Sequence, residues 1–344
     1  MSNATDGQPM VTVTRLRKHF PIRRGVLRRQ VGAVRAVDNI SFEIRRGETL
    51  GLVGESGSGK TTTGRVMLAL DKPTEGQIEF RGQDLFSMAP EALRQARRDI
   101  QFIFQDPYAS LNPRMRVGDT IREPLEVHEI GTPDEREARV ETLLEMVGMD
   151  ASHATRFPHE FSGGQRQRIG IARALATEPS FIVADEPISA LDVSIQAQIV
   201  NLLADLKAKL GLTYLFIAHD LSMVRHLSDR VAVMYLGRLV EIGNVDDIFG
   251  TPLHPYTRAL IAAMPVAGTT ASAGKPQSLQ GEIPDPAAPP PGCSFHTRCP
   301  FATDECRRAA PELRTIEARS TMQEVACHHA GSIKHAPANK ESET

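Results

Sequence analysis

Apolar and polar positions alternate at both ends of the stretch 11–53, which is the pattern of half-buried β-strands. Val11 and Val13 alternate with threonines, and Phe42 and Ile44 alternate with polar residues. Successive side chains on a strand point to opposite faces of a sheet, so this period of two predicts β structure. We therefore expect strands within residues 11–53.

Beyond this region, short apolar runs alternate with segments of helical periodicity. The expected strands are Thr49–Val53, Ile100–Phe104, Phe181–Ala184, Thr213–Ala218, Val231–Tyr235 and Leu239–Ile242. The expected helices are Lys60–Leu70, Asp134–Val147, Gln165–Ala176 and Leu221–Leu227. Strands that alternate with helices form a mostly parallel sheet with helices on its faces, so the fold class is α/β. The mainly helical stretch 106–177 reads as a subdomain inserted into it.

The composition changes toward both ends of the chain. Residues 1–10 and 331–344 are expected to be disordered, and residues 11–264 to form the main domain. Residues 265–292 are rich in Ala, Gly, Ser and Pro, which predicts a linker. Residues 293–330 then form a small C-terminal extension that carries all four cysteines.

Overall composition is that of a soluble globular protein. Hydrophobic residues make up 41% and charged residues 24%, and the net charge of −2 argues against nucleic acid as a partner. No apolar run reaches the roughly 18 residues that a membrane-spanning helix needs. Residues 1–10 are polar and lack the apolar core of a signal peptide. We therefore expect a cytoplasmic protein that reaches a membrane only through a partner.

A strongly basic stretch separates the first predicted strands. Such a run is most simply a solvated hairpin loop, and contact with phosphate or lipid headgroups is the alternative. Its residues are Arg15, Arg17, Lys18, Arg23, Arg24, Arg28, Arg29 and Arg35.

A glycine-rich loop lies between the strand Thr49–Val53 and the following helix. Its glycines allow backbone N–H groups to approach phosphate oxygens, and the helix N-terminus adds a positive dipole end. Lys60 is expected to reach the β- and γ-phosphates, Thr61 to bind Mg²⁺, and Thr62 to line the same site. This motif alone is common to GTPases, kinases, helicases and transporters. It reads Gly54-Glu55-Ser56-Gly57-Ser58-Gly59-Lys60-Thr61.

Two carboxylates follow the buried strand Phe181–Ala184. Asp185 at the end of this strand is expected to hold Mg²⁺, and Glu186 to act as the general base toward an attacking water. His219 follows the strand Thr213–Ala218, so it is expected to face the same crevice and to contact the γ-phosphate or that water.

A second phosphate-binding pattern consists of small residues before a helix, in the order Ser162-Gly163-Gly164-Gln165. With this motif the chain resembles the ABC-transporter ATPases, whose signature reads Leu-Ser-Gly-Gly-Gln; Phe161 stands here in place of the leading Leu. The resemblance implies that the motif binds the γ-phosphate of ATP held by an opposite subunit. Two ATP molecules would then lie between two subunits.

Other family elements follow in the family's order over roughly residues 11–265. The resemblance implies that Gln105 contacts Mg²⁺ and senses the membrane partner, and that His219 is the switch histidine. Ser189–Asp192 matches the D-loop at the dimer interface, and Phe20 is placed to stack on adenine. The implied fold is a P-loop NTPase with a RecA-like core, an antiparallel β subdomain and a helical subdomain. The implied catalytic residues are Lys60, Gln105, Glu186 and His219.

Two further segments, residues 104–114 and His254–Leu260, resemble the dipeptide and oligopeptide importer ATPases. This branch implies a second, different ATPase subunit, two transmembrane permease subunits and, indirectly, an extracytoplasmic peptide-binding protein. The chain would be peripheral, at the cytoplasmic face of the inner membrane. Nickel importers share these features, so nickel or another small solute is an alternative cargo. A soluble ABC ATPase that acts on nucleic acid is a further alternative, although the coiled coils and zinc insertions of such proteins are not visible.

The cysteines have the spacing C-x5-C-x6-C-x20-C. Four thiolates can hold zinc or a [4Fe–4S] cluster, or they can remain free. The spacing is wider than the pairs usual for zinc, and the resemblance to the peptide-importer ATPases implies an iron–sulfur cluster. Because the segment has few apolar residues, we expect a metal centre to stabilise its fold. The residues are Cys293, Cys299, Cys306 and Cys327.

Overall fold

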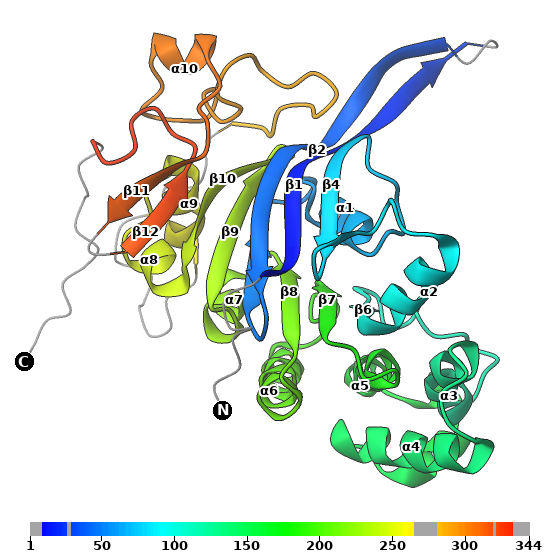
Figure 1. Ribbon diagram of the computed structural model, residues 1–344. Helices are drawn as coiled ribbons and strands as arrows, with labels where there is room; N and C mark the ends of the chain where they lie inside the picture. The colour runs from blue at the N-terminus through cyan, green and yellow to red at the C-terminus, as the bar shows by residue number, and fades with distance from the viewer. Residues whose placement is uncertain (1–8, 26–28, 265–280, 319–320, 333–344) are drawn as a thin grey trace, which may run out of the picture.

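A computed structural model describes residues 9–25, 29–264, 281–318 and 321–332. Its centre is an eight-stranded sheet with the strand order β11-β12-β10-β9-β3-β8-β7-β6 (Figure 1). The five strands from β9 to β6 are parallel, whereas β10, β12 and β11 pair in antiparallel fashion. The strands are β3 (Thr49–Val53), β6 (Ile100–Ile103), β7 (Phe181–Asp185), β8 (Thr213–Ala218), β9 (Arg230–Tyr235), β10 (Arg238–Asn244), β11 (Arg314–Ala318) and β12 (Thr321–Val325).

A second, four-stranded antiparallel sheet has the order β2-β1-β4-β5. Its strands are β1 (Pro9–Arg24), β2 (Arg29–Arg45), β4 (Glu75–Phe80) and β5 (Gln83–Asp84). The mostly parallel main sheet and the separate antiparallel sheet confirm the predicted α/β fold of the ATPase core.

The helices confirm the alternation that the sequence predicts, with small shifts at their ends. Within the described residues none is long and apolar enough to cross a membrane. The helices are α1 (Lys60–Met67), α2 (Pro90–Asp99), α3 (Val117–Val127), α4 (Pro133–Met146), α5 (Gly163–Leu175), α6 (Val193–Leu210), α7 (Leu221–Leu227), α8 (Val245–Gly250), α9 (Pro255–Ala262) and α10 (Asp304–Arg308), with short 3-10 turns η1 (Ala151–Thr155) and η2 (Pro158–Glu160).

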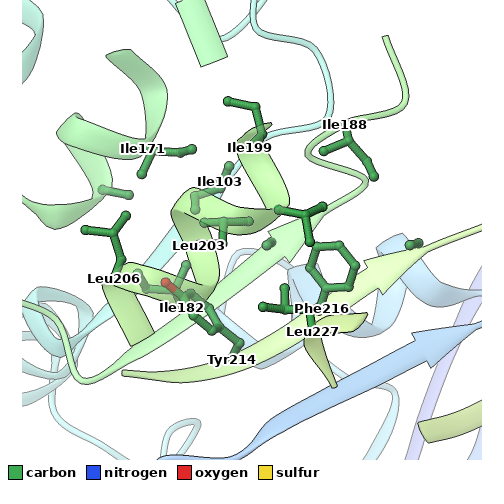
Figure 2. Close-up of a cluster of buried hydrophobic side chains, with 14 of the residues drawn as sticks. Ile103, Ile171, Ile182, Ile188, Ile199, Leu203, Leu206, Tyr214, Phe216 and Leu227 are labelled. Carbon is green, nitrogen blue, oxygen red and sulfur yellow. The ribbon is translucent and has the colours of Figure 1, made fainter. Parts of the chain in front are cut away.

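Alternate residues of the central strands pack on opposite faces of the main sheet. Figure 2 shows one face, where Ile182 and Tyr214 lie among Leu203 and Leu206 of α6. On the other face, side chains such as Ile217 join the core formed by α1 and the antiparallel sheet. The sheet is therefore covered on both sides, as the apolar character of its strands requires.

The predicted helical subdomain is present within residues 106–177. Helices α3, α4 and α5 lie below one end of the sheet in Figure 1. Their core includes Val117, Ile121, Leu143 and Ile169, which are fully buried.

Strands β1 and β2 run through the basic stretch, and Arg15, Arg23, Arg24, Arg29 and Arg35 are exposed on them. They form a long hairpin that extends beyond the rest of the molecule in Figure 1. Acidic partners for Arg17 are Asp38 of β2 in the same hairpin and Glu75 of β4, and Asp38 also lies near His19 and Arg238. Arg28 lies outside the described residues. The predicted solvated hairpin is therefore present, but its arms are paired strands and not a loop, because strand pairing satisfies the backbone and side-chain charge does not prevent it.

The N-terminal boundary also needs correction. Strand β1 begins at Pro9 and Met10 is buried, so positions 9 and 10 belong to the fold and not to a disordered lead. The other predicted lead residues, 1–8, lie outside the described residues, as do 265–280 of the predicted linker and 333–344 of the predicted tail.

The C-terminal extension is joined to the body more closely than its sequence indicates. Strand β12 continues the main sheet, with Val325 opposite Glu241 of β10. Phe295 is fully buried against Tyr235 and Tyr256, with ring centres 5.2 and 5.4 Å away. The expectation of little apolar core was therefore wrong, because the extension uses apolar side chains of the main domain.

Candidate functional site

The phosphate loop lies between β3 and α1 and has a shape that only glycine permits at two positions. Gly59 has φ of +104°, and a Cβ atom there would lie 2.0 Å from the carbonyl oxygen of Ala36. Gly54 has φ of +155°, and a Cβ atom would lie 2.2 Å from the carbonyl oxygen of Met234. Both contacts are with backbone, so the loop cannot adapt to a side chain.

Lys60 is held over this loop by carbonyl groups. Its Nζ donates to the carbonyl oxygens of Gly54 at 2.8 Å and Glu55 at 3.1 Å. Burial lowers the pKa of Lys60, while the nearby carboxylates of Glu186, Asp185 and Glu55 act in the opposite direction. Its ammonium is thus pre-positioned at the loop, and the buried Ser58 hydroxyl beside it lacks a hydrogen-bond partner within the described part of the chain. Both features suit a site for phosphate oxygens.

Thr61 and Asp185 are brought together from sequence positions far apart. The hydroxyl of Thr61 donates to Asp185 Oδ1 at 3.1 Å. Burial, and to a smaller extent the charge of Glu186, raise the pKa of Asp185 to about 6. A cation between these oxygens would favour the ionised carboxylate, and hydroxyl and carboxylate oxygens are ligands that Mg²⁺ prefers. The donor set therefore fits the magnesium ion that the sequence predicts.

Glu186 is the meeting point of the predicted catalytic residues. Gln105 Nε2 donates to Glu186 Oε2 at 2.8 Å, and His219 Nδ1 lies 3.5 Å from the same oxygen. The backbone of Glu186 has φ of +43°, which is uncommon outside glycine, and its N–H donates to the carbonyl of Ile217. A non-glycine residue held at positive φ indicates a constrained backbone. At Glu186 this constrained backbone carries a carboxylate that lies between the side chains of Gln105 and His219.

The signature motif forms the N-terminus of α5. The Ser162 hydroxyl accepts a hydrogen bond from the Gln165 N–H at 3.4 Å, and Gln165 Oε1 accepts one from the Ser162 N–H at 3.0 Å. This capping box leaves other first-turn N–H groups directed outward, as an anion site requires. Gly164 is closely packed, since a Cβ atom there would lie 2.5 Å from Ile195 of α6. The Ser-Gly-Gly-Gln segment is thus built as the sequence predicts, and its role toward a second subunit stays a prediction.

Several predicted nucleotide contacts lie on the loop or near it. Ser56 and Gly57 are exposed on the loop, and Thr62 is half-buried in the first turn of α1. Phe20 lies on β1 with 41% of its surface exposed, and the Lys18 ammonium is 4.9 Å from its ring centre. An exposed ring can accept an adenine, so the stacking role of Phe20 stays a prediction.

The four cysteines lie around one cavity of the extension. Burial raises the pKa of Cys293 and of Cys299 to about 11, and neighbouring cysteines add to this effect. Cys306 Sγ lies 3.5 Å from His329 Nε2. No group of three or more His, Cys, Asp or Glu residues in the described ranges is placed to hold a single metal ion, so the predicted iron–sulfur cluster is not confirmed. The lining includes Cys293, Cys299, Cys306, Cys327, His296, His328 and His329.

Two residues that touch the phosphate loop were not expected from the sequence. Tyr256 and Arg298 both contact Glu55. Tyr256 belongs to the His-Pro-Tyr segment, which indicates a family resemblance but does not indicate that Tyr256 contacts the phosphate loop. Arg298 has no local signal, because its partner is 243 positions away.

Comparison with known proteins places these features in one family. The ABC transporter family model matches residues 37–189, and the model for the oligopeptide/dipeptide transporter C-terminal region matches residues 240–306. The chain is 53% identical over 327 residues to the oligopeptide transport ATP-binding protein AppF of Bacillus subtilis, which covers 94% of this chain and 98% of that protein. It is 46% identical over 323 residues to the di/tripeptide transport ATP-binding protein DppF of Pseudomonas aeruginosa, covering 94% and 98%.

The fold has solved counterparts. One is a dimeric ATP-binding cassette in a post-hydrolysis state with ADP and Pi, which has a TM-score of 0.61 and 31% sequence identity. That match covers 69% of this chain and 99% of the other. The chain therefore belongs to the ATP-binding subunits of ABC transporters, and it carries the C-terminal region of the oligopeptide and dipeptide transporters.

Proposed function

We propose that this ATPase uses the energy of ATP hydrolysis to drive peptide import through a multi-subunit ABC transporter. The observation that carries the hydrolytic part is the convergence of Gln105 and His219 on the Glu186 carboxylate. The peptide cargo is supported by close relatives named for oligopeptide and di/tripeptide transport. No observation in the described residues favours nickel or nucleic acid over peptide.

The geometry supports a direct attack of water on the γ-phosphorus of ATP. Glu186 accepts a proton from that water while the water oxygen forms a bond to the γ-phosphorus. The bond from phosphorus to the β,γ-bridging oxygen breaks, which leaves ADP and inorganic phosphate. Gln105 and His219 hold the carboxylate in position, and the Lys60 ammonium offsets negative charge on the phosphates.

Thr61 and Asp185 are the residues that would hold Mg²⁺, with Gln105 as the third expected contact. When bound, the metal supplies charge neutralisation at the phosphate oxygens. The raised pKa of Asp185 reflects the burial of a carboxylate that is suited to a cation partner.

A complete site requires a second subunit, which we propose to supply its own signature motif. Ser162, Gly163 and Gly164 of this chain would bind ATP on the partner, with Gln165 supporting the cap. We propose a heterodimer with a second ABC ATPase, joined to two transmembrane permease subunits and, through them, to an extracytoplasmic peptide-binding protein. Attachment to the cytoplasmic face of the inner membrane would then be peripheral.

The test of this function is the substitution Glu186→Gln, which keeps the shape of the side chain and removes its basicity. We expect the variant to bind MgATP and to lose steady-state hydrolysis, and an ATP-bound dimer to accumulate in size-exclusion chromatography. Glu145→Gln on the exposed surface of α4 is the control and should behave as the wild type. Turnover at the wild-type rate in Glu186→Gln would refute the base assignment.

The cargo is tested separately, in cells that produce the wild-type or the Glu186→Gln chain. Uptake of labelled di-, tri- and pentapeptides should fall in the variant, whereas uptake of radioactive nickel should not change. A selective loss of nickel uptake would instead support the nickel alternative.

We also propose that Cys293, Cys299, Cys306 and Cys327 hold a [4Fe–4S] cluster. Four thiols around one cavity are the donor set of such a cluster. Anaerobic purification with a visible spectrum and iron and zinc analysis tests this. Close to four irons supports the cluster, and one zinc or no metal contradicts it.

A further inference from the structure

Glu55 of the phosphate loop is held on two sides by residues of the C-terminal part of the chain. The Tyr256 hydroxyl of α9 accepts a hydrogen bond from the Glu55 N–H at 2.8 Å. Arg298 donates through both terminal nitrogens, at 2.6 Å to Glu55 Oε2 and at 3.0 Å to Oε1. The main chain and the side chain of one loop residue are thus both fixed from more than 200 positions away.

The Arg298–Glu55 pair lies in a sheltered place. The Arg298 side chain is only 4% exposed and that of Glu55 24%. The guanidinium also lies 5.8 Å from the centre of the Tyr235 ring. Two parallel charge-assisted hydrogen bonds with little competing water fix both distance and orientation, which a single surface ion pair does not.

From Glu55 the contacts continue to the residues that meet phosphate. The Glu55 carbonyl oxygen accepts from Lys60 Nζ at 3.1 Å and from the Ser58 N–H at 3.2 Å. Displacement of Glu55 would therefore move an acceptor of the Lys60 ammonium and reshape the loop around Ser58.

On its other side, Arg298 is part of the cysteine-bearing segment. Its N–H donates to the Phe295 carbonyl at 3.0 Å, and Cys299 is the next residue. The Phe295 ring packs on Tyr256, so the two residues that hold Glu55 are also joined to each other. The extension and the phosphate loop thus form one continuous set of contacts.

We propose that Arg298 and Tyr256 are positioning residues for nucleotide binding. The C-terminal extension holds the phosphate loop of its own chain in the shape that accepts phosphate, and the affinity for ATP depends on this contact. The inference rests on ATP binding at the phosphate loop. If the wild-type chain bound no ATP, the proposed function itself would fail; if it bound ATP regardless of Arg298, only this inference would fail.

The experiment measures the Kd of the full chain for MgATP by competition with a fluorescent nucleotide, together with hydrogen exchange of the peptide that covers residues 54–60. Arg298→Met should raise the Kd about tenfold and speed exchange of that peptide, as coupled sites typically do. Arg307→Met is the matched control, because Arg307 lies in the same extension and pairs with Asp304 on its exposed surface. It should leave both quantities unchanged.

Further variants separate positioning from general stability. Glu55→Gln should raise the Kd by a similar factor, and the double variant with Arg298→Met should be no weaker than either single one, because both remove the same pair. Arg298→Lys should recover part of the affinity. Hydrolysis at saturating ATP should fall less than kcat/KM in every variant, since the loss is one of binding.

The inference is overturned by an unchanged Kd in a folded Arg298→Met chain, or by fully additive effects of Arg298→Met and Glu55→Gln. If Arg298→Met does not fold, Tyr256→Phe decides, because it removes only one hydroxyl. A wild-type Kd and wild-type exchange of residues 54–60 in Tyr256→Phe would then reject the proposal.

Discussion

Glu241 provides a quantitative test of how the C-terminal region is joined to the main sheet. This β10 residue is fully buried, and its two carboxylate oxygens accept the N–H groups of Leu253 at 2.6 Å and His254 at 3.0 Å. Burial raises the pKa of Glu241 to about 7, although these hydrogen bonds and the charge of Arg258 favour the charged form. The folded chain therefore holds a proton that the unfolded chain releases near its ordinary pKa of 4.5.

The sign of the pH effect follows from this difference. Because the pKa of Glu241 is higher in the folded state, its protonated carboxyl group stabilises the fold fully at pH values below the unfolded pKa of 4.5. This contribution to the free energy of unfolding is lost as the pH rises through the folded pKa of about 7. Each unit of pKa difference corresponds to about 1.4 kcal/mol. Part of the loss has already occurred at pH ~5.5, so we expect about 2 kcal/mol to be lost between pH ~5.5 and pH ~8.5.

The measurement is urea unfolding of the full chain at several pH values between these limits. Other groups also titrate, so the informative quantity is the difference in free energy of unfolding between the wild type and Glu241→Gln. That difference should change by about 2 kcal/mol across the range, because glutamine does not ionise. Glu43→Gln on exposed β2 is the control and should show no such change. A difference that stays constant with pH would refute the protonated, buried state of Glu241.

Two further predictions concern packing. Gly59→Ala should abolish detectable MgATP binding in a nucleotide-competition assay, because its Cβ would lie 2.0 Å from a carbonyl oxygen; Gly170→Ala in α5, where nothing lies within 4 Å, should bind normally. Phe295→Ala should lower the free energy of unfolding by about 3 to 5 kcal/mol, as expected for a buried aromatic side chain. Exposed Met322→Ala should change it by no more than about 0.5 kcal/mol, and equal effects of the two would contradict the packing described.

The central sheet and the hydrolytic site were largely predictable from the sequence. The boundaries of β3, β8 and α7 agree with those expected. Residues that follow parallel strands meet at one sheet edge, so the Thr61–Asp185 contact could be expected although 124 positions separate the two.

Other elements were not predicted, for different reasons. Helix α6 was not assigned, although its buried residues Ile199, Leu203 and Leu206 recur at helical spacing, so in that case the signal was present. Strand β12 has no comparable signal: it is short, and although β11 beside it in sequence is one partner, its place in the main sheet depends on β10, which lies far away in sequence. The Arg298–Glu55 pair is a purely tertiary contact, and neither residue differs from an ordinary surface charge when only its neighbours in the chain are considered.

The addition of β12 to the main sheet has a consequence for biosynthesis. During translation, β9 and β10 leave the ribosome well before the strand that covers the outer side of β10. Until then β10 is an open edge with unpaired backbone groups, which can pair with another nascent chain. A chain truncated after residue 264 would keep this edge permanently. Removal of the extension is therefore expected to yield an aggregating cassette instead of a smaller, independent one.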